Sequence, residues 1–296
     1  MDKLRRSMMF IPGNNPGMLQ NAGLYGADTI ILDCEDAVAI TEKDSARNLV
    51  FQAITDINYG TEVAVRINHI STPYGWDDLK RILPAKPDLI RLPMCQGPDE
   101  IHQIDEYISQ AEHKNNFTPG SIKMMAAVET PKGLRLAYEI ASASPRMVAL
   151  AIGAEDFTAN LKTTRSSLGR ELFVARGQLI LAAREAGIQC IDTVFANVND
   201  DEGLKNELEL IKEMGFDGKS VINPRQVTIV HDFFAPTAKE IDYAENVLAA
   251  YQDALEKKSG VISLNGKMID LPIVARAERV LAYAKATAAT AAKGGK

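Results

Sequence analysis

The chain has 296 residues, 46% of them hydrophobic and 24% charged, and its formal net charge is −6. This composition excludes a disordered chain, and the lack of a basic excess argues against nucleic-acid binding as the main role. Three cysteines do not make a disulfide framework, and unpaired cysteines suit a reducing compartment, so we expect a cytoplasmic protein. No apolar run predicts a signal peptide or a membrane span.

Short apolar runs alternate with helical patterns through most of the chain. The eight runs lie at residues 7–11, 29–32, 62–68, 89–93, 124–129, 147–153, 190–195 and 218–224. Several are apolar without alternation, as expected of strands that are buried on both faces. Eight strand-then-helix units predict a closed (β/α)8 TIM barrel. The alternative is an open doubly wound sheet, but PGNNPG at 12–17 does not match the Gly-x-Gly-x-x-Gly motif typical of one.

The C-terminal part follows a different pattern. A helical pattern at 237–257 precedes two short apolar runs joined by Asn265-Gly266, which predict a β-hairpin. Pro272 then opens a last helical pattern, and the end of the chain is rich in Ala and Lys. We therefore expect a barrel domain with a trailing helix at 1–257, a hairpin-plus-helix segment at 258–285 and a disordered tail at 286–296.

Polar residues follow several predicted strands at their C-terminal ends, where barrel enzymes place their active sites. They are Asp33, Glu35, Asp36, Arg66, Asn68, Glu129, Glu155, Asp156 and Asn223. Any one of them alone is an ordinary helix cap or loop residue, but several acids and an arginine at one rim indicate a site. From this set we expect Arg66, Glu129, Glu35, Asp36 and Asn223 to contact substrate.

Glu129 and Asp156 follow adjacent predicted strands and are the expected metal ligands. Carboxylates without clustered His or Cys suit Mg²⁺, which takes oxygen ligands from one or two carboxylates, water and substrate. The four histidines form neither an HxH nor an HExxH motif, so zinc is not expected.

Arg66 ends an apolar strand, where a buried cation needs a partner. We expect it to form an ion pair with Glu35 or Asp33, or to hold a substrate carboxylate or a developing alkoxide, and one arginine can have both roles at once.

A Schiff-base aldolase needs a lysine at the barrel mouth. Lys123 and Lys219 lie at the starts of strands, so imine chemistry is not expected. Asp270, by its position before Pro272, reads equally well as a helix N-cap.

Eight segments resemble, in this order and spacing, the family of citrate lyase and malyl-CoA lyase type barrels. They are RSMMFIPG at 6–13, LDCED at 32–36, VRIN at 65–68, IRLP at 90–93, AVETP at 127–131, GAED at 153–156, FDGKSVINPRQ at 216–226 and SLNGKMID at 263–270. The resemblance covers nearly the whole chain. Many malyl-CoA lyases carry His-Pro where this chain has Asn223-Pro224, and the Asn form resembles the citrate lyase β subunits.

The resemblance implies Mg²⁺ held by Glu129 and Asp156, a catalytic and substrate-binding Arg66, and an acid/base Asp270 on a C-terminal lid over a neighbouring protomer's site. The implied reaction is cleavage of a (3S)-citryl thioester, carried by an acyl carrier protein or CoA, to oxaloacetate and an acetyl thioester. This is a Mg-assisted reverse Claisen reaction. The implied partners are acyl carrier (γ) and transferase (α) subunits, together with further copies of this chain in a trimer or a multiple of it.

Two other functions remain open at this point. One keeps the fold and changes the substrate, giving a free-standing malyl-CoA or citramalyl-CoA lyase. The other is a non-catalytic scaffold subunit that has kept the barrel, against which the acidic pair and Arg66 argue.

Overall fold

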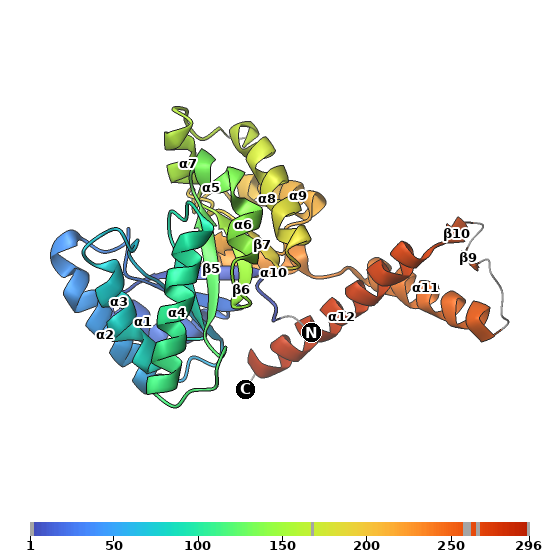
Figure 1. Cartoon of the computed structure of the whole chain (residues 1–296). Helices are drawn as coiled ribbons and strands as arrows, with labels where there is room; N and C mark the ends of the chain where they lie inside the picture. The colour runs from blue at the N-terminus through green and yellow to red at the C-terminus, as the bar shows by residue number, and fades with distance from the viewer. Residues whose placement is uncertain (1–2, 167–168, 257–261, 265–266, 295–296) are drawn as a thin grey trace. The chain divides into compact units, whose positions relative to one another are not determined.

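The computed structural model describes residues 3–166, 169–256, 262–264 and 267–294. The chain divides into two compact units, Met1–Phe233 and Phe234–Lys296, and each is described by itself (Figure 1).

Eight parallel strands close into a barrel in the first unit, each strand pairing with its neighbours in sequence. β1 pairs with both β2 and β8, which closes the ring. The predicted (β/α)8 barrel is confirmed, and the open sheet is excluded. The strands are β1 (Ser7–Pro12), β2 (Thr29–Asp33), β3 (Glu62–Arg66), β4 (Leu89–Leu92), β5 (Lys123–Val128), β6 (Met147–Ile152), β7 (Gln189–Asp192) and β8 (Gly218–Val221).

Helices follow the strands and surround the barrel (Figure 1). The α-helices of this layer are α1 (Pro16–Asn21), α2 (Lys43–Asp56), α3 (Gly75–Ile82), α4 (Pro98–Lys114), α5 (Pro131–Arg135), α6 (Ala137–Ser142), α7 (Ala154–Asn160), α8 (Phe173–Glu185), α9 (Asp201–Met214) and α10 (Pro224–Phe234). Short 3₁₀ helices add η1 (Ala22–Tyr25), η2 (Ile40–Glu42), η3 (Leu83–Ala85) and η4 (Arg170–Leu172).

Apolar side chains fill the barrel interior. The buried interior cluster is Met8, Ile31, Ala64, Leu89, Met125, Ala149, Ala151 and Ile191. Successive residues of a strand point to opposite faces, so the residue two positions further along also faces the interior, nearer the C-terminal end. By this alternation Asp33, Arg66 and Arg91 face the interior above the apolar layer. The barrel therefore places these three polar side chains at the rim where the sequence predicts a site.

The second unit contains α11 (Ala238–Glu256), β9 (Ile262–Leu264), β10 (Lys267–Ile269) and α12 (Leu271–Gly294). β9 and β10 are antiparallel, with Leu264 opposite Lys267, which confirms the predicted hairpin. Its turn residues, Asn265 and Gly266, lie outside the described residues.

The observed division differs from the predicted boundary at residue 257. α11 belongs to the second unit because it packs on α12 and β10 through its own apolar cluster. That cluster is Ala244, Val247, Ile269, Val274 and Ala277. α12 continues to Gly294 through the segment for which a disordered tail was predicted, since its alanines have high helix propensity. Among the described residues, no helix has the length and apolar character needed to span a membrane.

Candidate active site

Arg66 is anchored at the rim by the carboxylate of Asp33, on the neighbouring strand. Its Nε donates to Asp33 Oδ1 at 2.7 Å, and its Nη2 donates to Asp33 Oδ2 at 2.6 Å. Asp33 also accepts hydrogen bonds from the backbone N–H groups of Glu35 and Ala37. Burial acts to raise the pKa of Asp33, but Arg66 and these N–H groups outweigh it and lower the pKa. The ion pair expected for Arg66 is therefore present, and it fixes the plane of the guanidinium.

The remaining Arg66 nitrogen, Nη1, faces two more carboxylates. It lies 2.9 Å from Glu35 Oε2 and 3.3 Å from Asp36 Oδ2. Burial raises the pKa of Glu35 to about 8, because nearby Asp36, Glu129 and Asp33 add to the effect and Arg66 offsets it only in part. Glu35 can therefore hold a proton near neutral pH, whereas Asp33 is an anion.

Glu129 follows β5 and is only 4% exposed. Its Oε2 accepts a hydrogen bond from the backbone N–H of Met94 at 3.2 Å. Burial, with Asp156 adding to it, raises the pKa of Glu129 to about 7, although Arg91 and Arg66 act to lower it. The side chain lies against Gly153, where a Cβ would stand 2.5 Å from both Cγ and Oε1 of Glu129. Glycine is therefore required at the end of β6 for Glu129 to hold this position.

Asp156 lies in the first turn of α7 and is exposed at the rim. Partial burial and the charge of Asp36 raise its pKa, against the effect of Arg66. The pKa values of Glu129 and Asp156 are thus both raised, and Asp156 contributes to the shift of Glu129, which means that negative charge is crowded between β5 and β6.

A divalent cation would relieve this crowding. Among the described residues, no group of three or more His, Cys, Asp or Glu side chains forms a metal cage. Two carboxylates completed by water and substrate oxygens are, however, a usual Mg²⁺ site. Glu129 and Asp156 therefore fit the metal that the sequence predicts for them.

The other two predicted site residues have local structural roles. Asn223 follows β8, and its Oδ1 accepts a hydrogen bond from the backbone N–H of Arg225 at 3.0 Å, at the start of α10. Asp270 lies in the second unit, where its Oδ1 accepts from the N–H of Ile273 at 3.2 Å and its carbonyl accepts from Val274. Asp270 thus caps α12, as its position before Pro272 suggests.

Arg91 was missed as a site residue. It lies on β4 in register with Arg66 on β3, and its side chain is 3% exposed. The signal was the same as for Arg66, a single arginine inside an apolar strand. In the sequence, Arg91 was noted only as part of the family segment IRLP at 90–93.

The two lysines weighed as Schiff-base candidates lie away from the acidic rim or are held in an ion pair. Lys219 is completely buried, and its Nζ donates to Asp192 Oδ2 at 2.7 Å. The neighbouring Arg176 also forms a fork on Asp192, so this lysine is neutralised in a buried ion-pair cluster. Lys123 is the first residue of β5, at the end of the barrel opposite to the acidic rim.

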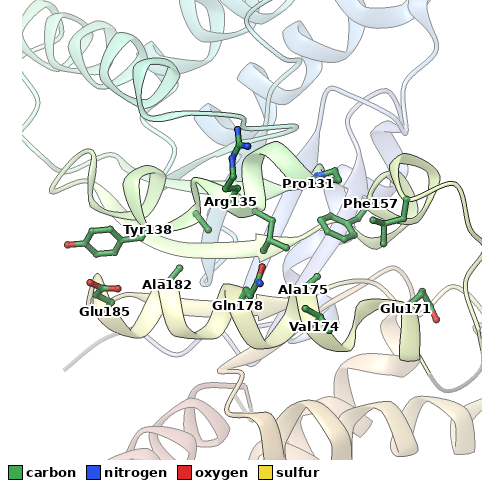
Figure 2. Close-up of a pocket in the computed structure, with 13 residues that line it drawn as sticks. Pro131, Arg135, Tyr138, Phe157, Glu171, Val174, Ala175, Gln178, Ala182 and Glu185 are labelled. Atoms are coloured by element: carbon green, nitrogen blue, oxygen red, sulfur yellow. The ribbon is translucent and has the colours of Figure 1, made fainter.

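One groove on the barrel unit lies away from these residues. It has a volume of about 550 Å³ and is lined by residues of α5, α6, α7 and α8. In Figure 2, Tyr138 and Glu185 lie at one end of the groove, and Phe157 and Glu171 lie towards the other. None of the predicted site residues lines it.

The model of the HpcH/HpaI aldolase/citrate lyase family matches residues 6–224. The chain belongs to this family. It is 49% identical to the citrate lyase subunit beta of Leuconostoc mesenteroides subsp. cremoris, over 96% of this chain and 95% of that protein.

Two solved structures from Mycobacterium tuberculosis are similar to the chain in fold. The CitE protein in complex with magnesium, acetoacetate and coenzyme A has a TM-score of 0.77 and 29% identity, covering 95% of this chain and 98% of that one. A citrate lyase beta subunit complexed with oxaloacetate and magnesium has a TM-score of 0.67 and 29% identity, covering 79% and 98%. The family resemblance seen in the sequence is confirmed.

Proposed function

We propose that this chain is the carbon–carbon lyase subunit that cleaves a (3S)-citryl thioester to oxaloacetate and an acetyl thioester. The observation that carries the proposal is one barrel rim that combines a guanidinium held by Asp33 with the paired carboxylates of Glu129 and Asp156. The 49% identity to a citrate lyase subunit beta supports it. The thioester is citryl-acyl carrier protein or citryl-CoA.

Glu129 and Asp156 would hold Mg²⁺. When bound, the ion supplies Lewis-acid polarisation of the substrate's tertiary hydroxyl and adjacent carboxylate. The protein's part is to keep the two carboxylates in place. The hydrogen bond from the Met94 N–H and the space left by Gly153 do this for Glu129.

Arg66 stabilises the negative charge that develops on the hydroxyl oxygen. Its Nε and Nη2 are occupied by Asp33, so Nη1 is the donor that faces the rim. Because the guanidinium is fixed before substrate arrives, little reorganisation is needed as the charge grows. Asp33 is therefore a positioning residue, and Arg66 is the catalytic one.

The reaction requires two proton transfers. The tertiary hydroxyl loses a proton as the carbon–carbon bond breaks and the ketone of oxaloacetate forms. The ionised form of Glu35 suits the acceptor, because a pKa raised to about 8 makes that form a stronger base than an ordinary carboxylate. The electron pair of the broken bond passes to the acetyl thioester as an enolate, and Asp270 returns a proton to its carbon.

We further propose that the hairpin and helix around Asp270 close as a lid over the barrel of a neighbouring copy. Asp270 belongs to the second unit and not to the barrel, which agrees with a role on a lid. The chain then works as a homo-oligomer, a trimer or a multiple of it, in the cytoplasm. It acts together with acyl carrier and transferase subunits.

Substitution of Asp270 separates its two roles. Asn is as good an N-cap as Asp, so Asp270→Asn keeps the cap and removes the acid. We expect Asp270→Asn to fold normally and lose most activity. Mixing it with Arg66→Lys should restore part of the activity if sites are shared, once mass spectrometry confirms subunit exchange. Full activity of Asp270→Asn would reduce Asp270 to a helix cap, and exchange without recovery would place the lid over its own barrel.

The experiment that tests the function is a cleavage assay with citryl-CoA, malyl-CoA and citramalyl-CoA, each with and without Mg²⁺. We expect Mg²⁺-dependent cleavage, with citryl-CoA giving the highest kcat/KM. Preference for malyl-CoA or citramalyl-CoA would make the chain a free-standing lyase of that substrate. A chain that cleaves none of them, with Mg²⁺ and an acyl carrier protein present, would be a scaffold.

A further inference from the structure

Arg91 is a buried cation at the rim, and the reaction scheme above gives it no role. It lies two residues after Leu89 of the interior cluster, so it faces the barrel interior at the C-terminal end of β4. Arg66 is its register partner on β3, and Glu129 follows β5 on its other side. Arg91 therefore lies between the catalytic guanidinium and a metal ligand.

The guanidinium of Arg91 lacks the anionic partner that the other buried arginines have. Arg5 forms a fork on Glu62, and Arg6 forms one on Asp28. Within the described part of the chain, no carboxylate oxygen lies within 4.0 Å of Arg91, and its Nε has no hydrogen-bond partner. This absence is notable because burying an unpaired charge is costly.

The contacts that Arg91 does make are weak. Its Nη1 lies 3.9 Å from Met125 Sδ, and its Cζ lies 5.0 Å from the centre of the Phe10 ring. Arg66 lies over the same ring at 4.8 Å. Burial, with Arg66 nearby, lowers the pKa of Arg91 to about 10, so the side chain stays charged at neutral pH. Its Nε is thus a buried donor on a charged side chain, and it has no hydrogen-bond partner within the described residues.

The substrate of the proposed citryl thioester lyase differs by one anionic group from the substrates of a malyl-CoA or citramalyl-CoA lyase. On the carbinol carbon, citryl carries a CH₂COO⁻ group where citramalyl carries a methyl group and malyl carries a hydrogen. The products differ in the same way, since oxaloacetate has a second carboxylate and pyruvate and glyoxylate do not. Arg66 is already neutralised by Asp33, so it is not free to hold a second carboxylate in a fork.

We propose that Arg91 binds the terminal carboxylate of the citryl group and thereby selects a citryl over a malyl or citramalyl thioester. This proposal rests on the proposed function, because it names the residue that determines the acyl group at the same site. A buried donor that is paired only when the correct substrate binds discriminates strongly against an analogue lacking the partner group.

The rival explanation is that Arg91 only serves as a counter-charge for Glu129. Its charge does act to lower the pKa of Glu129. In that case, removing Arg91 would weaken Mg²⁺ binding and affect ligands with one or two carboxylates alike. The two explanations therefore predict different ratios between the affinities for oxaloacetate and for pyruvate, although both predict a loss of activity.

The test is the binding of oxaloacetate and pyruvate, measured by calorimetry at saturating Mg²⁺, for the full-length wild type and for Arg91→Met. Met approximates the length of the side chain and removes the charge. We expect the Kd for oxaloacetate to rise about 100-fold and the Kd for pyruvate to change less than about threefold. Arg91→Lys should recover part of the oxaloacetate affinity. An equal change for both ligands, or no change for either, would overturn the proposal.

Arg81→Met is the matched control. Arg81 lies on α3 in the outer helix layer, with its Cζ 3.6 Å from the centre of the Phe51 ring and its Nε donating to Asn48. It loses a comparable arginine–phenylalanine contact away from the rim, so both Kd values should stay at the wild-type level. Cleavage of citryl-CoA by the wild type is measured in parallel. Its absence would contradict the proposed function, whereas the affinity ratio of Arg91→Met tests Arg91 itself.

Discussion

Gly153→Ala tests whether the position of Glu129 limits catalysis. A Cβ at residue 153 would stand 2.5 Å from Oε1 and Cγ of Glu129 and 2.7 Å from its Cδ. Carbon contacts are normally 3.5–4.0 Å, so the carboxylate must move by about 1 Å. A displacement of that size at a catalytic group lowers the rate about 100-fold, which corresponds to about 2.7 kcal/mol of activation free energy. We expect kcat/KM for citryl-CoA to fall by this factor and the Mg²⁺ concentration for half-activation to rise.

The assay is oxaloacetate release measured over a Mg²⁺ titration, with the midpoint of thermal unfolding recorded in parallel. Gly177→Ala is the control, because it is the same substitution inside α8, where an added Cβ meets nothing within 4 Å. It should leave activity unchanged and stabilise the fold by up to about 1 kcal/mol. Wild-type activity and Mg²⁺ response in a folded Gly153→Ala protein would refute the argument that Glu129 must lie against Gly153.

Three further predictions follow from single side chains. Glu129→Gln and Asp156→Asn should each abolish Mg²⁺-dependent turnover while the thermal midpoint stays near wild type, because rim residues contribute little to barrel stability; near-normal activity and metal affinity in either would contradict the metal assignment. Arg66→Lys should lower kcat more than it raises KM, since a lysine cannot keep both hydrogen bonds to Asp33 while donating to the developing alkoxide. Steady-state kinetics that show a change in KM alone would mean that Arg66 only binds the substrate in its ground state. Glu112 accepts hydrogen bonds from Arg146, Gly120 and Ile122, which outweigh its burial and lower its pKa to about 2. The contribution of ionised Glu112 to stability is therefore complete above about pH 4.5 and is lost as the pH falls towards 2. In urea unfolding, Glu112→Gln should cost about 3 kcal/mol at pH 7 and markedly less at pH 3, whereas an equal cost at both pH values would exclude this ionisation as the cause.

The barrel was predictable because its periodicity is simple. Each strand is a short apolar run and each polar rim residue comes directly after one, so the alternation of a strand and the barrel rule together place Asp33, Arg66 and Glu129 at one end. The division between the units was not predictable in the same way. The apolar face of α11 does not show from the sequence whether it packs on the barrel or on α12. The structure places Val247 of α11 in one cluster with Ile269, Val274 and Ala277 of the second unit.

The roles of individual rim residues depended on contacts that spacing does not show. The sequence raised Asp33 and Glu35 as alternative partners of Arg66, and the structure pairs it with both, leaving Glu35 with a raised pKa. The importance of Gly153 depends on a side chain from another strand that lies against it. Arg91 carries the same sequence signal as Arg66, a single arginine inside an apolar strand, but only the structure shows that its Nε lacks a hydrogen-bond partner.

The most direct test of the proposed reaction is the rate at which the purified chain releases oxaloacetate from a citryl thioester, before and after removal of Mg²⁺ by a chelator. We expect cleavage with Mg²⁺, loss of cleavage with the chelator and full recovery when Mg²⁺ is restored. We also expect that no Mg²⁺ concentration recovers the activity of Glu129→Gln. Cleavage at the same rate without a divalent cation, or undiminished cleavage by Glu129→Gln, would contradict the proposed reaction.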